Sequence, residues 1–227
     1  LTDITSELSV TTGRAVSRCK VELANYFAAA VLMPYDAFHA MAEQSGYDID
    51  RMASAFAVSF EQVCQRLTTL QRETKRGVPF FFLRVDKAGN VTKRFNATSF
   101  NIAEYGGSCP VWNLHTAFRT PGVIMPQFVE LPDGEKFFTL ARTTERPVYS
   151  IHTQDRRLAI SLGCEIKHAS KLIYTSSFQK PADENFSKIG INCYLCLRQN
   201  CSQRAHSPLF AELTTDTSRR GETRYES

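Results

Sequence analysis

Three of the seven cysteines fall within nine residues near the end of the chain, and this cluster constrains the fold more than any other feature. Cys193, Cys196 and Cys201 have the spacing C-x2-C-x4-C. Two cysteines in a C-x2-C pair can point their thiolates at one metal from a tight turn, and the third returns from the loop that follows. Such compact spacing indicates a metal site more than a disulfide framework or a group of buried, unligated thiols.

The fourth ligand of this site has two candidates, which imply different metals. His206 extends the motif to C-x2-C-x4-C-x4-H, which suits a tetrahedral zinc site. Cys164 is remote in sequence, but it would complete an all-thiolate set of the kind that iron–sulfur clusters use. Spacing alone favours zinc, because structural zinc sites are common.

Length and composition limit the class of protein. The 227 residues, 43% of them apolar, are enough for one large domain or two small ones with a sizeable core. The net charge of +4 is not concentrated in a way that requires nucleic acid. The sequence contains no apolar run long enough to span a membrane and no signal peptide, and the odd cysteine count argues against an oxidised framework. We therefore expect a cytoplasmic protein, and the first residue, Leu1, suggests a fragment of something longer.

The first segment, about residues 3–74, has a helical pattern. Apolar side chains recur at helical spacing at Ala24, Phe27, Ala28 and Val31, and Pro34 ends this helix. Further helices are predicted at about 35–44 and 48–56 and from Ser59 onward. The two short helices around 57–59 resemble a helix-turn-helix, but few basic residues would face a groove, so a packed helical bundle is the preferred interpretation.

From residue 77 onward the pattern is that of strands. Residues 80–85 and 91–95 are predicted to form one hairpin, and 127–131 and 136–141 a second. Extended pieces are predicted at 148–152, 158–162 and 170–174, with a short helix at 112–118. The predicted fold class is α+β: a helical N-terminal layer packed with a mostly antiparallel sheet and a cysteine-bearing C-terminal loop region. The predicted segments are 1–75, 76–213 and a polar tail, 214–227.

Two groups of side chains are candidates for a binding pocket. Residues 106–115 combine adjacent glycines with a proline and the only tryptophan, Trp112, although for Trp112 alone core packing is the better explanation. Aromatic residues near the first hairpin could line an apolar slot, but alternate strand positions face opposite sides, so at most half can share it. Basic residues of the same hairpin could meet phosphates or simply face solvent: these are Arg84, Lys87, Lys93 and Arg94.

Searches for catalytic motifs find little. The chain has no nucleophile elbow, no P-loop and no dinucleotide-binding glycine motif. Its histidines have no neighbours in sequence that would define a triad. The sequence therefore favours a protein that is not an enzyme.

Residues 24–34, ANYFAAAVLMP, resemble a signature of ImmA/IrrE-type metallopeptidase-like domains. That family carries a zinc-binding H-E-x-x-H helix upstream of the signature. This sequence has no such motif, and its first histidine is His39. Peptidase chemistry is therefore not transferred, and the helix is interpreted as scaffold.

Further segments extend the resemblance to a larger family. Residues 85–94, 107–113, 162–169 and 193–205 are similar, in the same order, to the C-terminal half of bacterial short-chain fatty acyl-CoA-responsive transcription regulators. These regulators control propionate, acetate and glyoxylate metabolism. They place a helix-turn-helix domain first, an ImmA/IrrE-like segment next and this cysteine-containing domain last. The similarity covers about residues 20–210 and implies that the DNA-binding domain is absent from this chain.

The resemblance implies a sensor that binds coenzyme A or a short-chain acyl-CoA, propionyl-CoA or acetyl-CoA, and carries a [4Fe–4S] cluster. It moves the choice of fourth ligand from His206 to Cys164, with Cys109 in reserve. The implied cluster ligands are Cys164, Cys193, Cys196 and Cys201. Arg198 and Arg204 would help to hold the negatively charged cluster and tune it.

The implied effector pocket combines basic and aromatic side chains. Phosphates would pair with the basic group and the rest of the ligand would lie along the aromatic group: Arg84, Lys93 and Arg94, then Phe81, Phe95 and Trp112. Binding would shift an oligomeric equilibrium, of a dimer or tetramer, and so act on promoter DNA through the absent helix-turn-helix domain. The competing hypothesis is a zinc-stabilised interaction module without a small-molecule ligand.

Overall fold

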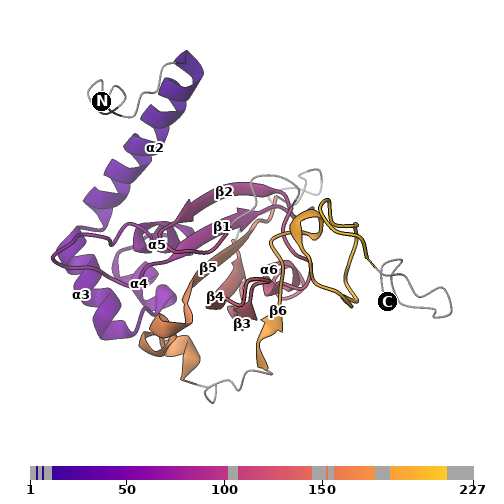
Figure 1. Ribbon diagram of the computed structural model, residues 1–227. Coiled ribbons are helices and arrows are strands. Elements are labelled where there is room, and N and C mark those ends of the chain that lie inside the picture. The colour runs from indigo at the N-terminus through magenta and orange to yellow at the C-terminus, as the bar shows by residue number, and fades with distance from the viewer. Residues whose placement is uncertain are drawn as a thin grey trace.

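A six-stranded sheet forms the centre of the protein. The computed structural model describes Ile4, Glu7, His152 and residues 12–101, 107–144, 156–176 and 185–213. Within these residues the strand order is β2-β1-β5-β4-β3-β6. The N-terminal helices lie along one side of the sheet, and the C-terminal loops lie at the end of the molecule farthest from the first long helix (Figure 1). The predicted α+β class is confirmed.

Capping residues that can be recognised in the sequence mark ends of the N-terminal helices. They are α2 (Gly13–Leu32), α3 (Tyr35–Ser45), α4 (Ile49–Ala55) and α5 (Phe60–Leu67). α3 ends at Gly46, whose positive φ of 61° suits a residue without a side chain. At the start of α5, Ser59 and Gln62 form the capping box that the sequence predicts.

Two hairpins supply four of the strands. The first joins β1 (Phe81–Val85) to β2 (Val91–Asn96), and the second joins β3 (Met125–Glu130) to β4 (Lys136–Thr143). The Asp86 carboxylate closes the first turn by accepting hydrogen bonds from the backbone N–H groups of Ala88 and Asn90, each at 2.9 Å. β5 (Ala159–Glu165) is antiparallel to both β1 and β4 and so joins the two hairpins.

The later part of the chain differs from the sequence-based predictions at two places. The segment expected to be extended at 170–174 instead forms 3-10 turns, η1 (Ile166–Lys171) and η2 (Ile173–Thr175). There the Tyr174 hydroxyl accepts a hydrogen bond from the Ile49 N–H at 2.8 Å, which anchors the turn to α4. The sequence did not predict β6 (Ser187–Lys188), which pairs parallel with β3. The tail 214–227 and most of 148–152 lie outside the described residues.

The sheet separates two cores, because successive side chains of a strand point to opposite faces. The helix-side core contains Phe82, Phe138 and Leu162 packed with α3, α4 and α5. It draws on both predicted segments, 1–75 and 76–213, so these pack as one body. The opposite core contains Phe81, Trp112 and the short helix α6 (Asn113–Thr116).

The α4–α5 pair is part of the bundle and does not present a recognition helix. Arg66, a residue that a DNA-reading helix would expose, is only 3% exposed, and its Nε donates a hydrogen bond to the Met33 carbonyl at 3.1 Å. The bundle interpretation therefore holds for this segment.

α2 stands away from the rest of the protein (Figure 1). None of its 20 residues is buried. Val21, Phe27 and Val31 are exposed by 59%, 71% and 62% on this helix. Within the described residues, no helix is both long enough and apolar enough to cross a membrane.

Candidate functional site: a cysteine cavity and a basic groove

Four cysteines surround one small cavity on the side of the sheet opposite the helices. Cys193 begins the 3-10 turn η4 (Cys193–Leu195), Cys196 ends it, and Cys201 follows in the next loop. Cys109, which precedes α6, provides the fourth thiol. We call this space the cysteine cavity, and its lining residues are Cys109, Pro110, Lys188, Gly190, Asn192, Cys193, Cys196, Arg198, Cys201, Gln203 and Arg204.

Backbone N–H groups lie against the Cys109 thiol. Burial raises the pKa of the Cys109 thiol, while backbone N–H groups of Gly190 and Val111 contact its sulfur and oppose that shift. Gly190 also approaches Cys196 closely, since a Cβ added at Gly190 would lie 2.7 Å from the Cys196 sulfur. Only a residue without a side chain fits there.

Two arginines hold the cysteine loop together. Arg204 is 3% exposed, and its guanidinium donates to the carbonyls of Cys193 and Cys196 at 3.4 and 3.3 Å, among others. Its Nε is buried and has no hydrogen-bond partner among the described residues. Arg198 ties the loop to β3 through the Glu130 carbonyl at 2.8 Å and the Glu130 carboxylate at 3.5 Å.

The chemistry of this cavity fits an anionic cluster. Lys188, Arg198 and Arg204 offset the charge that four thiolates and their metal would bring. An acceptor in the cavity would also satisfy the buried Arg204 Nε, whose lack of a partner is costly. Among the described residues, however, no three histidine, cysteine or acidic side chains are close enough to hold a metal ion. The cavity has a volume of about 10 Å³, so the loop would have to widen around a cluster.

The structure does not bring Cys164 to the other three cysteines. Cys164 lies on β5 with its side chain in the helix-side core, whereas Cys109 belongs to the core on the other face. Burial raises the pKa of the Cys164 thiol to about 12. His206, the zinc candidate, stacks on Tyr194 with ring centroids 4.6 Å apart and does not line the cavity. The fourth ligand stays a prediction, and the geometry favours Cys109, the reserve candidate, over Cys164.

A second hollow lies between α2 and the first hairpin, with a volume of about 470 Å³. We call it the basic groove because it holds four cations and a single carboxylate. Its lining residues are Arg18, Glu22, Arg84, Val91, Thr92, Lys93, Arg94 and Phe95. Four of the six residues predicted for the effector pocket thus come together here.

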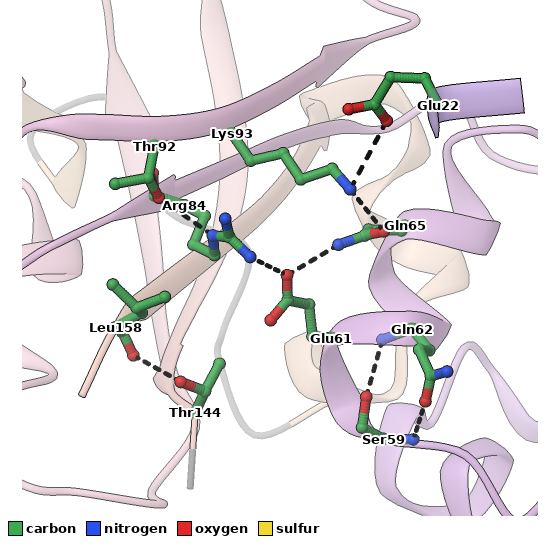
Figure 2. Close-up of polar contacts among 10 residues, drawn as sticks. All are labelled: Glu22, Ser59, Glu61, Gln62, Gln65, Arg84, Thr92, Lys93, Thr144 and Leu158. Atoms are coloured by element: carbon green, nitrogen blue, oxygen red, sulfur yellow. Dashed lines mark hydrogen bonds and ion pairs between the residues drawn. The ribbon is translucent and has the colours of Figure 1, made fainter. Parts of the chain in front are cut away.

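Figure 2 shows how the groove is attached to the helices. The Glu61 carboxylate of α5 accepts hydrogen bonds from Arg84 at 2.6 Å and from Gln65 at 2.8 Å. Lys93 donates to the Gln65 side-chain oxygen at 3.2 Å and lies 3.8 Å from the Glu22 carboxylate of α2. Arg84 is thus held by an ion pair, while Lys93 links α2, α5 and the edge strand β2.

The other two predicted pocket residues, Phe81 and Trp112, lie in the opposite core. Their ring centroids are 6.1 Å apart, and Phe100 stacks on Phe81 at 4.0 Å. Trp112 lines a third hollow, which we call the aromatic cavity; Phe81 does not line it. Its lining residues are Leu83, Val91, Phe100, Asn101, Gly107, Ser108, Trp112, Gly190 and Ile191. The predicted pocket is therefore divided between a groove and a cavity.

Sequence reasoning also missed a polar pair beside the aromatic cavity. The Ser108 Oγ lies 3.0 Å from the Nε2 of His115, which the sequence left without a partner. Burial lowers the pKa of His115, so its imidazole is neutral at physiological pH. Arg18 and Glu22 were missed too, because only the orientation of α2 brings them to the hairpin.

Comparison with known proteins places this geometry in a family. Residues 69–225 match the family model described as "Short-chain fatty acyl coenzyme A regulator, C-terminal", and residues 7–68 match "IrrE N-terminal-like domain". The first match covers more than half of the sequence. The chain belongs to the short-chain fatty acyl-CoA regulators, as the sequence motifs predict.

Individual relatives agree with this assignment. A propionyl-CoA carboxylase regulator of Cereibacter sphaeroides is 46% identical over 215 residues, which are 95% of this chain and 46% of that protein. The HTH-type transcriptional regulator PrpR of Mycobacterium tuberculosis is 44% identical over 206 residues, 91% of this chain and 42% of that protein. The chain thus spans less than half the length of these relatives.

A solved structure has the same fold. It is described as a Mycobacterium tuberculosis transcriptional regulator, and it superposes with a TM-score of 0.92 at 40% sequence identity. The match covers 100% of this chain and 70% of that chain. PrpR and the solved structure are described as transcriptional regulators, and the Cereibacter protein is named a regulator of propionyl-CoA carboxylase.

Proposed function

We propose that this chain is the ligand-sensing part of a transcription regulator that binds coenzyme A or a short-chain acyl-CoA and carries a [4Fe–4S] cluster. The observation that carries the proposal is the convergence of four cysteines and three cations on one cavity, and one of these cations, Arg204, has a buried Nε without a hydrogen-bond partner among the described residues. The effectors proposed are propionyl-CoA and acetyl-CoA, and the genes are those of propionate and acetate use. The regulated DNA would be bound by a domain outside this chain, in a homo-oligomer.

Cys109, Cys193, Cys196 and Cys201 are the proposed ligands, with Cys109 in place of Cys164. When bound, a [4Fe–4S] cluster supplies a redox-active and negatively charged group. The backbone N–H groups at Cys109 would stabilise its thiolate, and Arg204 would offer its Nε–H to the cluster. Gly190 leaves room for the Cys196 sulfur.

The metal content of two matched variants tests this ligand set. Protein purified without air is expected to contain about four irons and four sulfides per chain, with a brown colour. Cys109→Ala is expected to lose most of both, whereas Cys164→Ala, on the other face of the sheet, is expected to keep them. One zinc per chain without colour would instead support the zinc-stabilised module, and loss of iron only in Cys164→Ala would restore the original ligand.

The basic groove is the proposed site for the phosphates of coenzyme A. Four cations in one groove provide a positive potential, and Arg and Lys side chains are the usual partners of phosphate oxygens. The phosphates would compete with Glu22 for Lys93, whose 3.8 Å ion pair is partly exposed and therefore weak.

Calorimetric titration with coenzyme A tests the groove. Lys93→Gln is expected to weaken binding about tenfold, the loss typical of one charged hydrogen bond. Lys87→Gln is the matched control, because Lys87 lies in the hairpin turn and does not line the groove. Raising the salt concentration should weaken binding by the wild type more than by Lys93→Gln. Equal affinities of the two variants would contradict the placement.

A further inference from the structure

One side of α2 is apolar and exposed over several turns. Ala24, Phe27, Ala28 and Val31 recur at i, i+3, i+4 and i+7, which places them on one side of the helix, and Val21 extends this side by one turn. All five residues are exposed. We call them the α2 apolar face. Apolar residues that are exposed singly need no explanation, but a contiguous stripe of them marks a surface that binds a partner.

The contacts between α2 and the rest of the protein use a different side of the helix. Arg18 and Glu22 line the basic groove, Tyr26 lies against the Arg66 guanidinium, and Ala29 packs against the helix-side core. These four α2 residues are spaced i, i+4, i+8 and i+11, so they share one side, roughly opposite the α2 apolar face. The attachment of α2 to the protein therefore leaves the α2 apolar face open to a partner.

The charges of α2 favour a second copy of the same helix as that partner, in the antiparallel direction. Arg14, Arg18 and Lys20 lie in its first half, whereas residues 23–32 carry no charge. The first turn has no acidic residue and the last turn no basic one. Cations at the positive end of a helix dipole are unfavourable, and the negative end lacks a counter-charge. An antiparallel copy corrects both, because it brings the basic half of each helix to the uncharged C-terminal half of the other. A parallel copy would place the two basic halves together.

The shape and size of the face also suit a pair of helices. Ala24 and Ala28 are small enough to let two helices approach closely, and the larger Phe27 and Val31 lie beside them. A helix of 20 residues is about 30 Å long, and covering one side of it in each of two copies buries on the order of 1,200 Å² in total. That area is at the lower end of specific protein interfaces, so a dimer of modest affinity is expected.

We propose that the α2 apolar face binds the α2 apolar face of a second copy, antiparallel and with the two-fold axis passing by Ala24. Phe27 of one copy then lies beside Val21 of the other, and Arg14 lies at the C-terminal end of the other helix. The inference specifies the homo-oligomer of the proposed function. Its tests need neither metal nor coenzyme A, so their failure would leave the proposed sensing function standing.

Sedimentation of the chain at protein concentrations from about 1 to about 100 µM tests the interface. The wild type is expected to approach twice the chain mass of 25.6 kDa. Phe27→Glu should weaken dimerisation by at least about thirtyfold, the loss typical of a central aromatic anchor, and should keep the far-UV circular dichroism of the wild type because Phe27 is exposed. Val123→Glu is the matched control: Val123 is 55% exposed and lies outside α2, so this variant should dimerise like the wild type. A wild type that is monomeric throughout would overturn the proposal and assign the face to a partner other than this chain, and a dimer that Phe27→Glu does not weaken would exclude this face as the interface.

Cross-linking at two exposed positions of α2 tests the direction of the pair. Ala24→Cys should oxidise to a covalent dimer well above the wild-type background, because the two copies of this residue meet at the axis. Ser17→Cys should stay at the background, since antiparallel packing holds the two copies of residue 17 about 21 Å apart, too far for a disulfide. Equal cross-linking of both variants would overturn the antiparallel arrangement in favour of a parallel one, and cross-linking of neither would overturn the placement of the axis at Ala24.

Discussion

The close packing of the central strand β5 requires a glycine at position 163. Gly163, in the central strand β5, faces the opposite core, and a Cβ there would lie 2.4 Å from the Phe81 ring and 3.0 Å from the Phe138 carbonyl oxygen. Phe81 cannot move away, since it is buried and packs on Phe100, Trp112 and Phe137. The position therefore requires glycine for steric reasons, and not for its backbone flexibility.

We expect Gly163→Ala to lower the free energy of unfolding by about 1–3 kcal/mol, the usual cost of overpacking a core. Urea denaturation followed by circular dichroism measures it. Gly13→Ala is the matched control, because no atom lies within 4 Å of a Cβ added at that exposed helix start. A loss below the error of the measurement for Gly163→Ala would mean that Phe81 can repack.

The burial of the His115 imidazole predicts how the stability of the protein depends on pH. Burial lowers the pKa of His115 in the folded protein below the ordinary value of 6.5. The unfolded chain then binds a proton at higher pH than the folded one, so this contribution to stability is complete above 6.5 and is lost as the pH falls. Below pH 6.5 the free energy of unfolding of the wild type, measured with urea, should therefore fall more steeply than that of His115→Gln. Parallel curves for the two proteins would show that folding does not lower the pKa of His115.

At the scale of elements, α2 is held to the protein by few contacts. The Glu22–Lys93 ion pair and the Arg66 guanidinium, 5.6 Å from the centre of the Tyr26 ring, provide two of them. Because Glu22 is the single carboxylate of the basic groove, it opposes the binding of any anion there.

Glu22→Gln is accordingly expected to bind coenzyme A more tightly than the wild type, by about two- to fivefold at low salt. Calorimetric titration at two salt concentrations checks this, and the gain should shrink at the higher one. The control is Glu43→Gln, on α3 and outside the groove. Weaker binding by Glu22→Gln would instead indicate that Glu22 positions Lys93 for the ligand.

The sequence predicts the individual helices and turns of this protein, but not how they pair and pack. Helical periodicity, Pro34, Gly46 and the capping box identify the helices, and the turn at 86–90 identifies the first hairpin, because these signals are local. The face of a strand is not a local property. β5 offers Cys164 to the helices and Gly163 to the other core, and nothing in the strand itself decides this.

The candidate site shows the same limit. Local spacing finds Cys193, Cys196 and Cys201, but the fourth thiol depends on which loop packs against them. The residues predicted for one effector pocket lie on both faces of the sheet. Phe95, like Phe82, faces the helices, whereas Phe81 and Trp112 face the opposite core. The pair β3–β6 is also outside the reach of the sequence, since a strand of two residues has no periodicity.

At the scale of the whole molecule, the cysteine loop is attached to a body that does not depend on it. The helix-side core contains no residue from the C-terminal segment 185–213, and among the residues of that segment only Ile189 belongs fully to the opposite core. The loop has little regular structure of its own and is held by Arg198 on Glu130 and by Arg204. Loss of its metal should therefore loosen the loop and leave the sheet folded.

We expect the double variant Cys193→Ser/Cys196→Ser to be cleaved faster by protease within residues 190–213, while its far-UV circular dichroism stays close to that of the wild type. Its melting temperature should fall little, because the helix-side core is intact. Cys64→Ser gives the opposite control: Cys64 is fully buried in that core, so this change should lower the melting temperature and leave cleavage of the folded loop unchanged. Cooperative unfolding of the entire double variant would contradict this division, because it would make the metal site a condition for folding of the sheet.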